Sequence, residues 1–291
     1  MQGSTDRAKI LICDLDNTLY DWVAYFVPSF YAMVDALIEI TDWDKEQVLD
    51  EFHRIHQKYG STEHPFSLLE LESVQKKFGH LPRAELAKEF DSAFLVFNRS
   101  RKRTLNCYSG VRDTLSQLKK QGVPLIAYTD SNVIAVVDRL KRLELADYFS
   151  AVYCKELSAT EHPAGISLEQ WAEDFPLEQV VELSAEDKKP NPAILRRICT
   201  DFETQPERAA YVGDSLSRDI YMAKLAGVTS IWAKYGTQHP EGFYDKLVRV
   251  THWTQADVAE EKLHWNLSKD IVPDYTLEHS FSELAVLFSE S

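Results

Sequence analysis

Cysteine is scarce in this chain of 291 residues, which contains only four, at positions 13, 107, 154 and 199. No two of them stand in C-x-x-C spacing, so the sequence predicts reduced core thiols rather than disulfides or a zinc site. No uninterrupted apolar run approaches the roughly 18 residues that a membrane span requires, and no secretion signal opens the chain. These absences predict a cytoplasmic protein without a membrane partner.

Positive charge is also in short supply. The formal net charge is −14, which argues against a nucleic acid polymer as a partner, because clustered Lys and Arg drive that binding. The basic cluster Arg99–Arg103 is short, and we interpret it as a solvated linker or hinge rather than a binding patch. An acidic protein repels an anionic substrate at long range, so a phosphate site here requires local cations, and we expect a divalent metal among them.

Short apolar runs alternate with helical patterns over most of the chain. Ile10–Cys13, Leu125–Tyr128 and Ala209–Val212 are typical of buried strands, and segments of helical periodicity separate the later runs. This alternation predicts βαβ units and a parallel sheet. The predicted fold class is therefore α/β, with a Rossmann-like doubly wound sheet.

A long helical segment interrupts the alternation after the first strand. Apolar residues recur every three or four positions from Phe26 to Leu37, which is the spacing of one helix face. We therefore assign residues 21–108 to an inserted α-helical module. Residues 1–20 and 109–291 form the discontinuous core in this interpretation.

Two further segments are longer than a minimal core requires. Residues 154–188 are polar and acidic, and we interpret them as a surface excursion or a second lid. Residues 237–270 include Trp253 and Trp265, which indicate a helical excursion that packs its aromatics on the core. The sequence predicts no function for either segment.

His53 and His56 lack a third metal ligand, so we assign them to a solvated helix face.

Carboxylates and a hydroxyl group follow the first predicted strand, in the segment Asp14–Thr18. The two aspartates are two positions apart and can point to the same side of an extended segment. Similar polar groups follow in order in Thr129–Asn132, Lys188–Pro192 and Gly213–Asp219. Because open α/β sheets bind ligands at the carboxyl ends of their strands, these segments predict one shared site.

With these four segments in this order, the chain resembles the haloacid dehalogenase-like superfamily of phosphohydrolases over most of residues 9–236. The resemblance implies that the inserted α-helical module, residues 21–108, is a cap domain. The resemblance implies that Asp14 is the nucleophile and forms an aspartyl-phosphate. Asp16 is then the general acid for the leaving group and the general base for the hydrolytic water. Thr129 and Asp130 bind the substrate phosphate. The lysine of this pattern stands immediately before Pro-x-Pro, which favours Lys189 over its neighbour Lys188.

The same resemblance implies a Mg²⁺ site. Asp214 is the predicted ligand on the strand-to-helix turn, together with the carboxylate of Asp14 and the main-chain carbonyl of Asp16. Asp219 has three possible roles that the sequence leaves open: it binds the metal through water, orients Lys189, or caps the following helix.

The second aspartate of the first motif favours phosphoryl transfer over dehalogenation, because dehalogenase members lack it. We therefore predict a Mg²⁺-dependent phosphomonoester hydrolase that acts on a small phosphorylated metabolite, such as a nucleotide or a sugar phosphate. A phosphomutase or phosphotransferase and a non-catalytic phosphate-binding module are the alternatives. Tyr20, Trp22 and Tyr25, at the start of the insertion, either contact the leaving group or serve as core residues.

Overall fold

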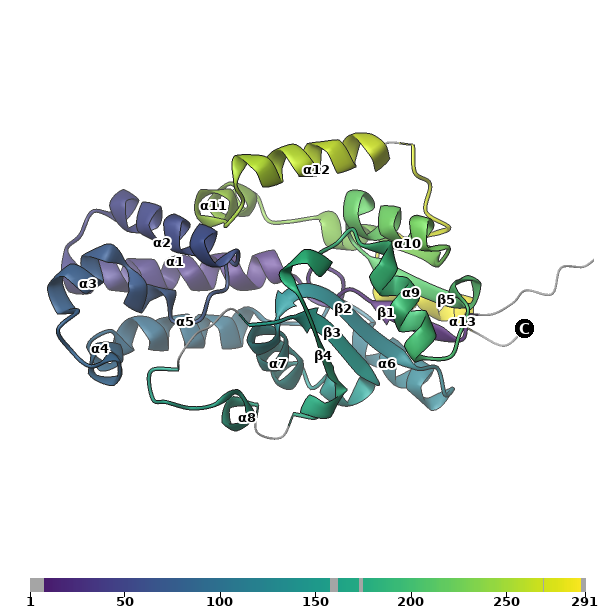
Figure 1. Cartoon of the computed structure of the whole chain (residues 1–291), viewed down its shortest axis with the longest axis horizontal. Helices are drawn as coiled ribbons and strands as arrows, with labels where there is room; N and C mark the ends of the chain where they lie inside the picture. Colours follow the sequence, from purple (N-terminus) through teal and green to yellow (C-terminus); the bar gives the residue numbers. More distant parts are fainter. Residues whose placement is uncertain (1–7, 158–161, 173–174, 269, 289–291) are drawn as a thin grey trace, which may run out of the picture.

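A computed structural model describes residues 8–157, 162–172, 175–268 and 270–288 of the chain. In it, seven parallel strands form one sheet in the order β4-β3-β2-β1-β5-β6-β7 (Figure 1). The strands are β1 (Ile10–Cys13), β2 (Leu125–Asn132), β3 (Ala151–Lys155), β4 (Val180–Leu183), β5 (Ala209–Gly213), β6 (Thr229–Ala233) and β7 (Tyr275–Leu277).

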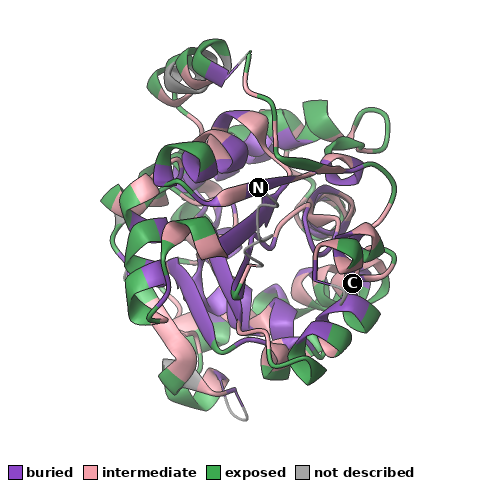
Figure 2. Ribbon diagram, turned by 90° about the vertical axis from the view of Figure 1, so that its right-hand side faces the viewer, coloured by how far each residue is buried: buried purple, intermediate pink, exposed green. Residues whose placement is uncertain are grey.

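Helices cover both faces of this sheet, and the buried strands run between them (Figure 2). Along β1, Ile10 and Ile12 pack towards α9 and α10, whereas Leu11 and Cys13 pack towards α6 and α7. This two-sided burial explains why the strand is apolar throughout. The α-helices that follow the strands are α6 (Val111–Lys120), α7 (Val133–Arg142), α8 (Leu168–Trp171), α9 (Pro192–Asp201), α10 (Tyr221–Ala226) and α13 (Ala285–Phe288). The predicted fold class is confirmed.

The sheet reverses its strand order next to β1. The chain runs outward from β1 to β4 and then returns to place β5 on the other side of β1. A ligand crevice is expected at such a switch point, outside the carboxyl ends of the strands. A π-helical turn, η6, and short 3-10 turns complete the core: η2 (Ala146–Tyr148), η3 (Leu177–Gln179), η4 (Ala185–Asp187), η5 (Pro206–Arg208), η6 (Leu216–Ile220), η7 (Lys234–Thr237) and η8 (Phe281–Leu284).

The described elements between Trp22 and Thr104 are all helices, as the sequence predicts. Asp21 begins the first of them by accepting a hydrogen bond from the Ala24 amide at 2.8 Å. The apolar positions predicted between Phe26 and Leu37 are buried, and this helix packs along α5. The elements are α1 (Trp22–Thr41), α2 (Lys45–Tyr59), η1 (Ser67–Glu70), α3 (Glu72–Phe78), α4 (Arg83–Glu89) and α5 (Asp91–Thr104).

Helix α1 corrects one expectation. Within the described parts of the chain it is long and apolar enough to cross a membrane, by length and composition alone. A count of uninterrupted apolar runs overlooks it because Asp35 and Glu39 fall in its second half. A buried core helix passes the same test, and α1 packs against α2, α5 and α11.

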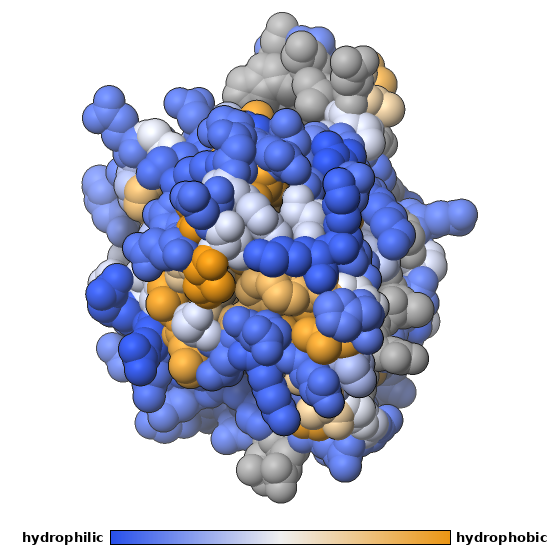
Figure 3. Space-filling model, turned by 90° about the vertical axis from the view of Figure 1, so that its left-hand side faces the viewer, coloured by the Kyte–Doolittle hydropathy of each residue, from blue (hydrophilic) through white to orange (hydrophobic). Residues whose placement is uncertain are grey.

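The end of the molecule formed by these insertion helices carries an apolar patch framed by hydrophilic residues (Figure 3).

The segment 237–270 is helical as predicted, but its first helix packs elsewhere than predicted. Helix α11 (Phe243–Val250) contacts α1 and α2 of the insertion, whereas α12 (Gln255–Ser268) contacts η6 of the core. Trp253 is half-buried, and the side chain of Trp265 lies outside the described residues. By its contacts α11 groups with the helical insertion, and the division of the chain into core and cap stays a prediction.

The packing of α11 also corrects the assignment of the two histidines. His56 is fully buried, and its Nδ1 lies 2.6 Å from the carbonyl oxygen of Val250 in α11. His53 is half-buried. A helix face that the sequence predicts to be solvated is therefore covered by a distant segment of the chain. His56 and Val250 are 194 positions apart.

The segment 154–188 is predicted to be a surface excursion or a second lid, but part of it belongs to the sheet as the edge strand β4. Its short helix α8 approaches the insertion, where the rings of Phe66 and Trp171 have centroids 6.3 Å apart. Residues 158–161 and 173–174 of this segment lie outside the described residues.

Candidate active site

The loop after β1 is fixed at both ends. The amide of Asp14 donates to the carbonyl of Val212 in β5 at 2.9 Å, which holds the loop at the switch point. Asn17 has a φ of 57°, a left-handed conformation that asparagine tolerates better than most residues. The chain thereby turns back, and Thr18 Oγ1 donates to Asp14 Oδ2 at 3.0 Å. Thr18 belongs to the first motif, and its role becomes visible only in the structure.

Lys189 brings a buried positive charge to this loop. Its Nζ lies 2.5 Å from Asp14 Oδ1 and 2.9 Å from Asp219 Oδ1. Burial alone would lower the pKa of Lys189, but the two carboxylates outweigh burial and raise it. The neighbouring Lys188 is half-exposed, and its Nζ lies 3.8 Å from Asp257. Of the two lysines, the structure therefore brings Lys189 to Asp14.

Three carboxylates converge beside this lysine. Asp14, Asp214 and Asp219 each offer one oxygen, and these oxygens all lie within 4.8 Å of one another. Burial, followed by the neighbouring carboxylates, raises the pKa of Asp214 well above its ordinary value. Burial also raises the pKa of Asp14, to about 7, despite the opposing effect of Lys189. A hard divalent cation such as Mg²⁺ fits this oxygen donor set and would keep the carboxylates ionised.

The sequence leaves three possible roles open for Asp219. The structure shows contacts that correspond to two of them, one with Lys189 and one with the first turn of η6. Its Oδ1 accepts from Lys189 and from the hydroxyl of Tyr211, the latter at 2.8 Å. Its Oδ2 accepts from the Ser215 amide at 3.1 Å, at the start of η6. Asp219 thus contacts both the lysine and the first turn of η6, while Ser215 itself is the N-cap.

The end of β2 is placed beside the same lysine. Thr129 is buried, and its Oγ1 accepts from the Ser131 amide at 3.2 Å. Asp130 accepts from the Lys189 amide at 3.0 Å and also pairs with Arg218. The carboxylate of Asp130 is therefore engaged within the protein, on the main chain that carries Lys189.

Asp16 has a separate set of partners. Ser131 Oγ donates to Asp16 Oδ2 at 2.6 Å, and an Arg139 guanidinium nitrogen lies 3.4 Å from Asp16 Oδ1. Arg139 also pairs with Glu63 of the helical insertion, at 2.5 Å. Burial raises the pKa of Glu63. The sequence does not predict that Ser131, Arg139 and Glu63 surround Asp16. The one indication in the sequence is Arg139, a single arginine among the apolar residues of the buried face of α7.

Two glycines allow other loops to approach the site. A Cβ on Gly236 would lie 1.7 Å from the carbonyl oxygen of Asn17, so η7 rests directly on the first loop. A Cβ on Gly213 would lie 2.4 Å from Asp219 Cγ. Trp232 Nε1 donates to the carbonyl of Asp214 at 2.8 Å and fixes the turn after β5. These close contacts explain why side chains are excluded at both glycines.

The aromatic residues near the start of the insertion are mostly core. Tyr20 and Tyr25 are almost fully buried, and Arg101 donates to the Tyr25 hydroxyl at 3.3 Å. Trp22 is half-buried and stacks on Phe26 with ring centroids 5.1 Å apart. Of the three, Trp22 keeps the most exposed surface for a leaving group.

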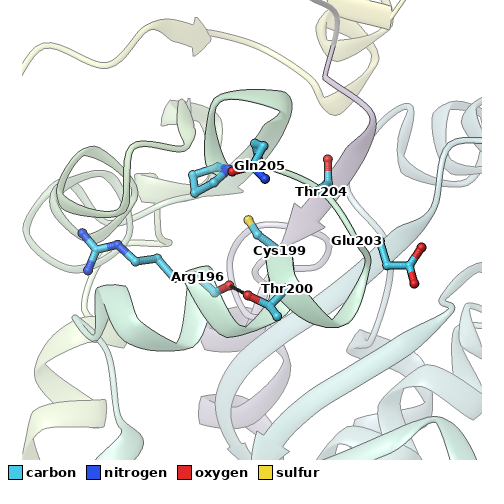
Figure 4. A pocket seen from close by; sticks show the side chains of 7 residues that line it. Arg196, Cys199, Thr200, Glu203, Thr204 and Gln205 are labelled. Carbon is cyan, nitrogen blue, oxygen red and sulfur yellow. Dashed lines mark hydrogen bonds between the residues drawn. The ribbon is translucent and has the colours of Figure 1, made fainter.

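A pocket of about 380 Å³ lies elsewhere, between the end of α9 and the loop that leads into β5 (Figure 4). This loop precedes the amino end of its strand, whereas Asp14 and Asp214 follow the carboxyl ends of theirs. The Cys199 thiol in the pocket is a poor nucleophile, because burial raises its pKa to about 11. Arg196 and Glu203 point away from each other in Figure 4. The pocket therefore does not combine groups for catalysis.

Comparisons with known proteins agree with the arrangement at the strand ends. The sequence profile of haloacid dehalogenase-like hydrolases matches residues 8–227. The chain is 27% identical over 236 residues to the glyceraldehyde 3-phosphate phosphatase of Pyrococcus furiosus, with 79% of this chain and 82% of the relative covered. It is 28% identical over 194 residues to the phosphoglycolate phosphatase of Nitrosospira multiformis, with 61% and 73% covered.

A solved structure with the same fold is the 2-haloacid dehalogenase from Pseudomonas syringae pv. tomato. Its TM-score is 0.53 at 22% identity, with 97% of this chain and 98% of that chain covered. At this identity the likeness supports the fold alone. Since the family profile spans most of the chain, from the first strand to α10, the protein is a hydrolase of the haloacid dehalogenase-like family.

Proposed function

We propose that this hydrolase releases phosphate from a small phosphomonoester in a Mg²⁺-dependent reaction, through an aspartyl-phosphate on Asp14. The observation that carries the proposal is the contact of Asp14 with Lys189, beside the carboxylates of Asp214 and Asp219. A nucleophilic carboxylate must approach an anionic phosphoryl group, and cations are required to offset their repulsion.

Asp14 would attack phosphorus through one carboxylate oxygen. Lys189 holds the other carboxylate oxygen and supplies a positive charge next to the transferred group. Mg²⁺ bound by Asp14 and Asp214 would neutralise further negative charge on the phosphoryl oxygens. Thr129 and the main-chain amides that follow it would hold those oxygens in line.

Asp16 would donate its proton to the leaving oxygen and later remove a proton from the hydrolytic water. Its carboxylate lies two residues after the nucleophile, with 21% of its side chain exposed, so it can reach the crevice. A leaving alkoxide requires such a donor, and this supports phosphoester hydrolysis over dehalogenation at this site.

The substrate proposed is a small phosphorylated metabolite. Relatives named for glyceraldehyde 3-phosphate and phosphoglycolate support this size class. The half-buried Trp22 is the proposed contact for the leaving group from the insertion side. A cytoplasmic location accompanies the proposal, supported by four free cysteines.

The proposal is tested by measuring phosphate release from a panel of phosphomonoesters with Mg²⁺ and with EDTA. We expect release only with Mg²⁺, and none from the Asp14→Asn protein, which lacks a nucleophilic carboxylate. Asp214→Asn should raise the Mg²⁺ concentration needed for half-maximal rate. Circular dichroism checks that each variant is folded. Retained activity in folded Asp14→Asn would contradict the covalent mechanism, and transfer of phosphate to a second acceptor would identify a phosphotransferase.

A further inference from the structure

A buried ion cluster joins the helical insertion to the proposed proton donor. Arg139 of α7 is fully buried. One of its guanidinium nitrogens lies 2.5 Å from Glu63 Oε2, and another lies 3.4 Å from Asp16 Oδ1. Glu63 stands between α2 and η1, so the insertion reaches across to the first catalytic loop at this point.

Packing alone does not account for this cluster. Among the described residues, Asp16 Oδ1, Arg139 Nε and the Tyr20 hydroxyl are buried and make no hydrogen bond, although Asp16 Oδ1 keeps its ionic contact with Arg139 at 3.4 Å. Buried polar atoms without partners reduce stability, and apolar residues of similar shape would fill the same space at less cost. The three atoms gather around Asp16, the residue that must exchange a proton with the substrate.

The two carboxylates share the arginine unequally. The contact to Glu63 is short and charge-assisted, whereas the contacts to Asp16 are long, at 3.4 and 3.5 Å. If Glu63 were removed, the guanidinium group of Arg139 would be available to bind the Asp16 carboxylate through two short hydrogen bonds. Glu63 thereby keeps the arginine from drawing the Asp16 carboxylate away from the crevice.

We infer that Glu63, acting through Arg139, is a positioning residue that keeps Asp16 within reach of the leaving oxygen. The inference rests on the proposed function. In the step concerned, a bond forms between Asp14 and phosphorus while the bond from phosphorus to the leaving oxygen breaks. The leaving oxygen takes the proton of Asp16. Because Glu63 belongs to the insertion, Asp16 is placed correctly only while the insertion rests on the core.

A neighbouring ion pair supplies the matched control. Arg101 of α5 and Asp138 of α7 also join the insertion to the core, with nitrogen and oxygen 3.0 Å apart. Asp138 is adjacent in sequence to Arg139, but its hydrogen-bond donors in the described part of the chain, Arg101 and Arg142, are not residues of the catalytic loop. Loss of this pair reports what a merely structural contact between insertion and core contributes.

The test compares Glu63→Gln with Asp138→Asn on two substrates. An alkyl phosphate such as glycerol phosphate releases a strongly basic alkoxide that needs a proton, whereas p-nitrophenyl phosphate releases a stable anion. The ratio kcat/KM is measured because it reports the steps up to phosphoryl transfer and excludes hydrolysis of the intermediate. We expect Glu63→Gln to lower kcat/KM for the alkyl phosphate about tenfold or more, and for p-nitrophenyl phosphate by less than about twofold. Asp138→Asn should change both by less than about twofold.

An equal loss on both substrates, or the same pattern in Asp138→Asn, would overturn the inference and leave the proposed function standing. A wild-type protein that releases phosphate from neither substrate would overturn the proposed function, and the inference with it. Thermal unfolding and near-ultraviolet circular dichroism establish that the variants are folded. If Glu63→Gln does not fold, Glu63→Asp serves instead, because the shorter carboxylate withdraws from Arg139 while the charge is kept. The same selective loss is expected.

Discussion

Two buried cations in this molecule each lie between two carboxylates, but these carboxylates come from different parts of the chain. Lys189 lies between the carboxylates of Asp14 and Asp219, and Arg139 lies between those of Asp16 and Glu63. Within the described chain, both carboxylates that contact the lysine amine lie in segments that follow strands β1 and β5. One partner of the arginine instead belongs to the helical insertion.

The comparison shows what a carboxylate partner does to a buried base. Burial would lower the pKa of either cation, yet the acidic neighbours raise both pKa values. His56 is the contrasting case, since it is buried against a carbonyl oxygen with no carboxylate bonded to it in the described chain. Burial lowers its pKa to about 4. Charge is therefore retained at the two sites with acidic partners, one in the core and one shared with the insertion.

The largest effect should come from breaking the lysine cluster. Lys189→Met should lower kcat/KM about a thousandfold, because it removes a fixed positive charge beside Asp14, the proposed nucleophile. Lys188→Met is the control, and the loss there should be less than about tenfold, since its amine lies near Asp257. Steady-state kinetics on one phosphomonoester measures both. Equal losses would show that the lysine adjacent to Pro190 is not the one that acts.

The second effect concerns stability. Arg139→Met should lower the free energy of unfolding by about 3–5 kcal/mol, because it removes a fully buried cation and leaves the half-buried carboxylates of Asp16 and Glu63 uncompensated. Arg101→Met, at the less deeply buried pair with Asp138, should lower it by only about 1–2 kcal/mol. Urea unfolding at neutral pH measures both values. If the free energy of unfolding falls by a similar amount in both proteins, the Arg139 cluster contributes no more to stability than the ion pair of Arg101 with Asp138.

The smallest of these effects is the pH dependence from His56, whose pKa of about 4 lies below its ordinary value of 6.5. Above pH 6.5 neither state holds the proton. Below it the unfolded chain binds a proton that the folded protein does not, so stability falls between pH 6.5 and 4, by up to about 3 kcal/mol. His56→Leu should be less stable at neutral pH but should lose less on acidification.

The control for histidine replacement itself is the exposed His80, where His80→Gln should leave the free energy of unfolding at neutral pH nearly unchanged. The measurement is the free energy of unfolding in urea at several pH values between 4 and 7. Parallel curves for wild type and His56→Leu would show that His56 does not carry the acid sensitivity.

The sequence by itself determined the sheet, the helical insertion and the four polar segments. These are local patterns: an apolar strand, the turn after it and the residues within that turn lie within a few positions of one another. The parallel arrangement then brings Asp14, Thr129 and Asp214 to one edge, because strands in such a sheet end on the same side.

Only the tertiary structure decided what surrounds these segments. Glu63 and Arg139 are separated by 76 positions, and His56 and Val250 by 194, and no spacing rule connects either pair. Such contacts depend on how the insertion and α11 rest on each other and on the core. That arrangement is set by side-chain packing across elements, which a local pattern in the sequence does not encode.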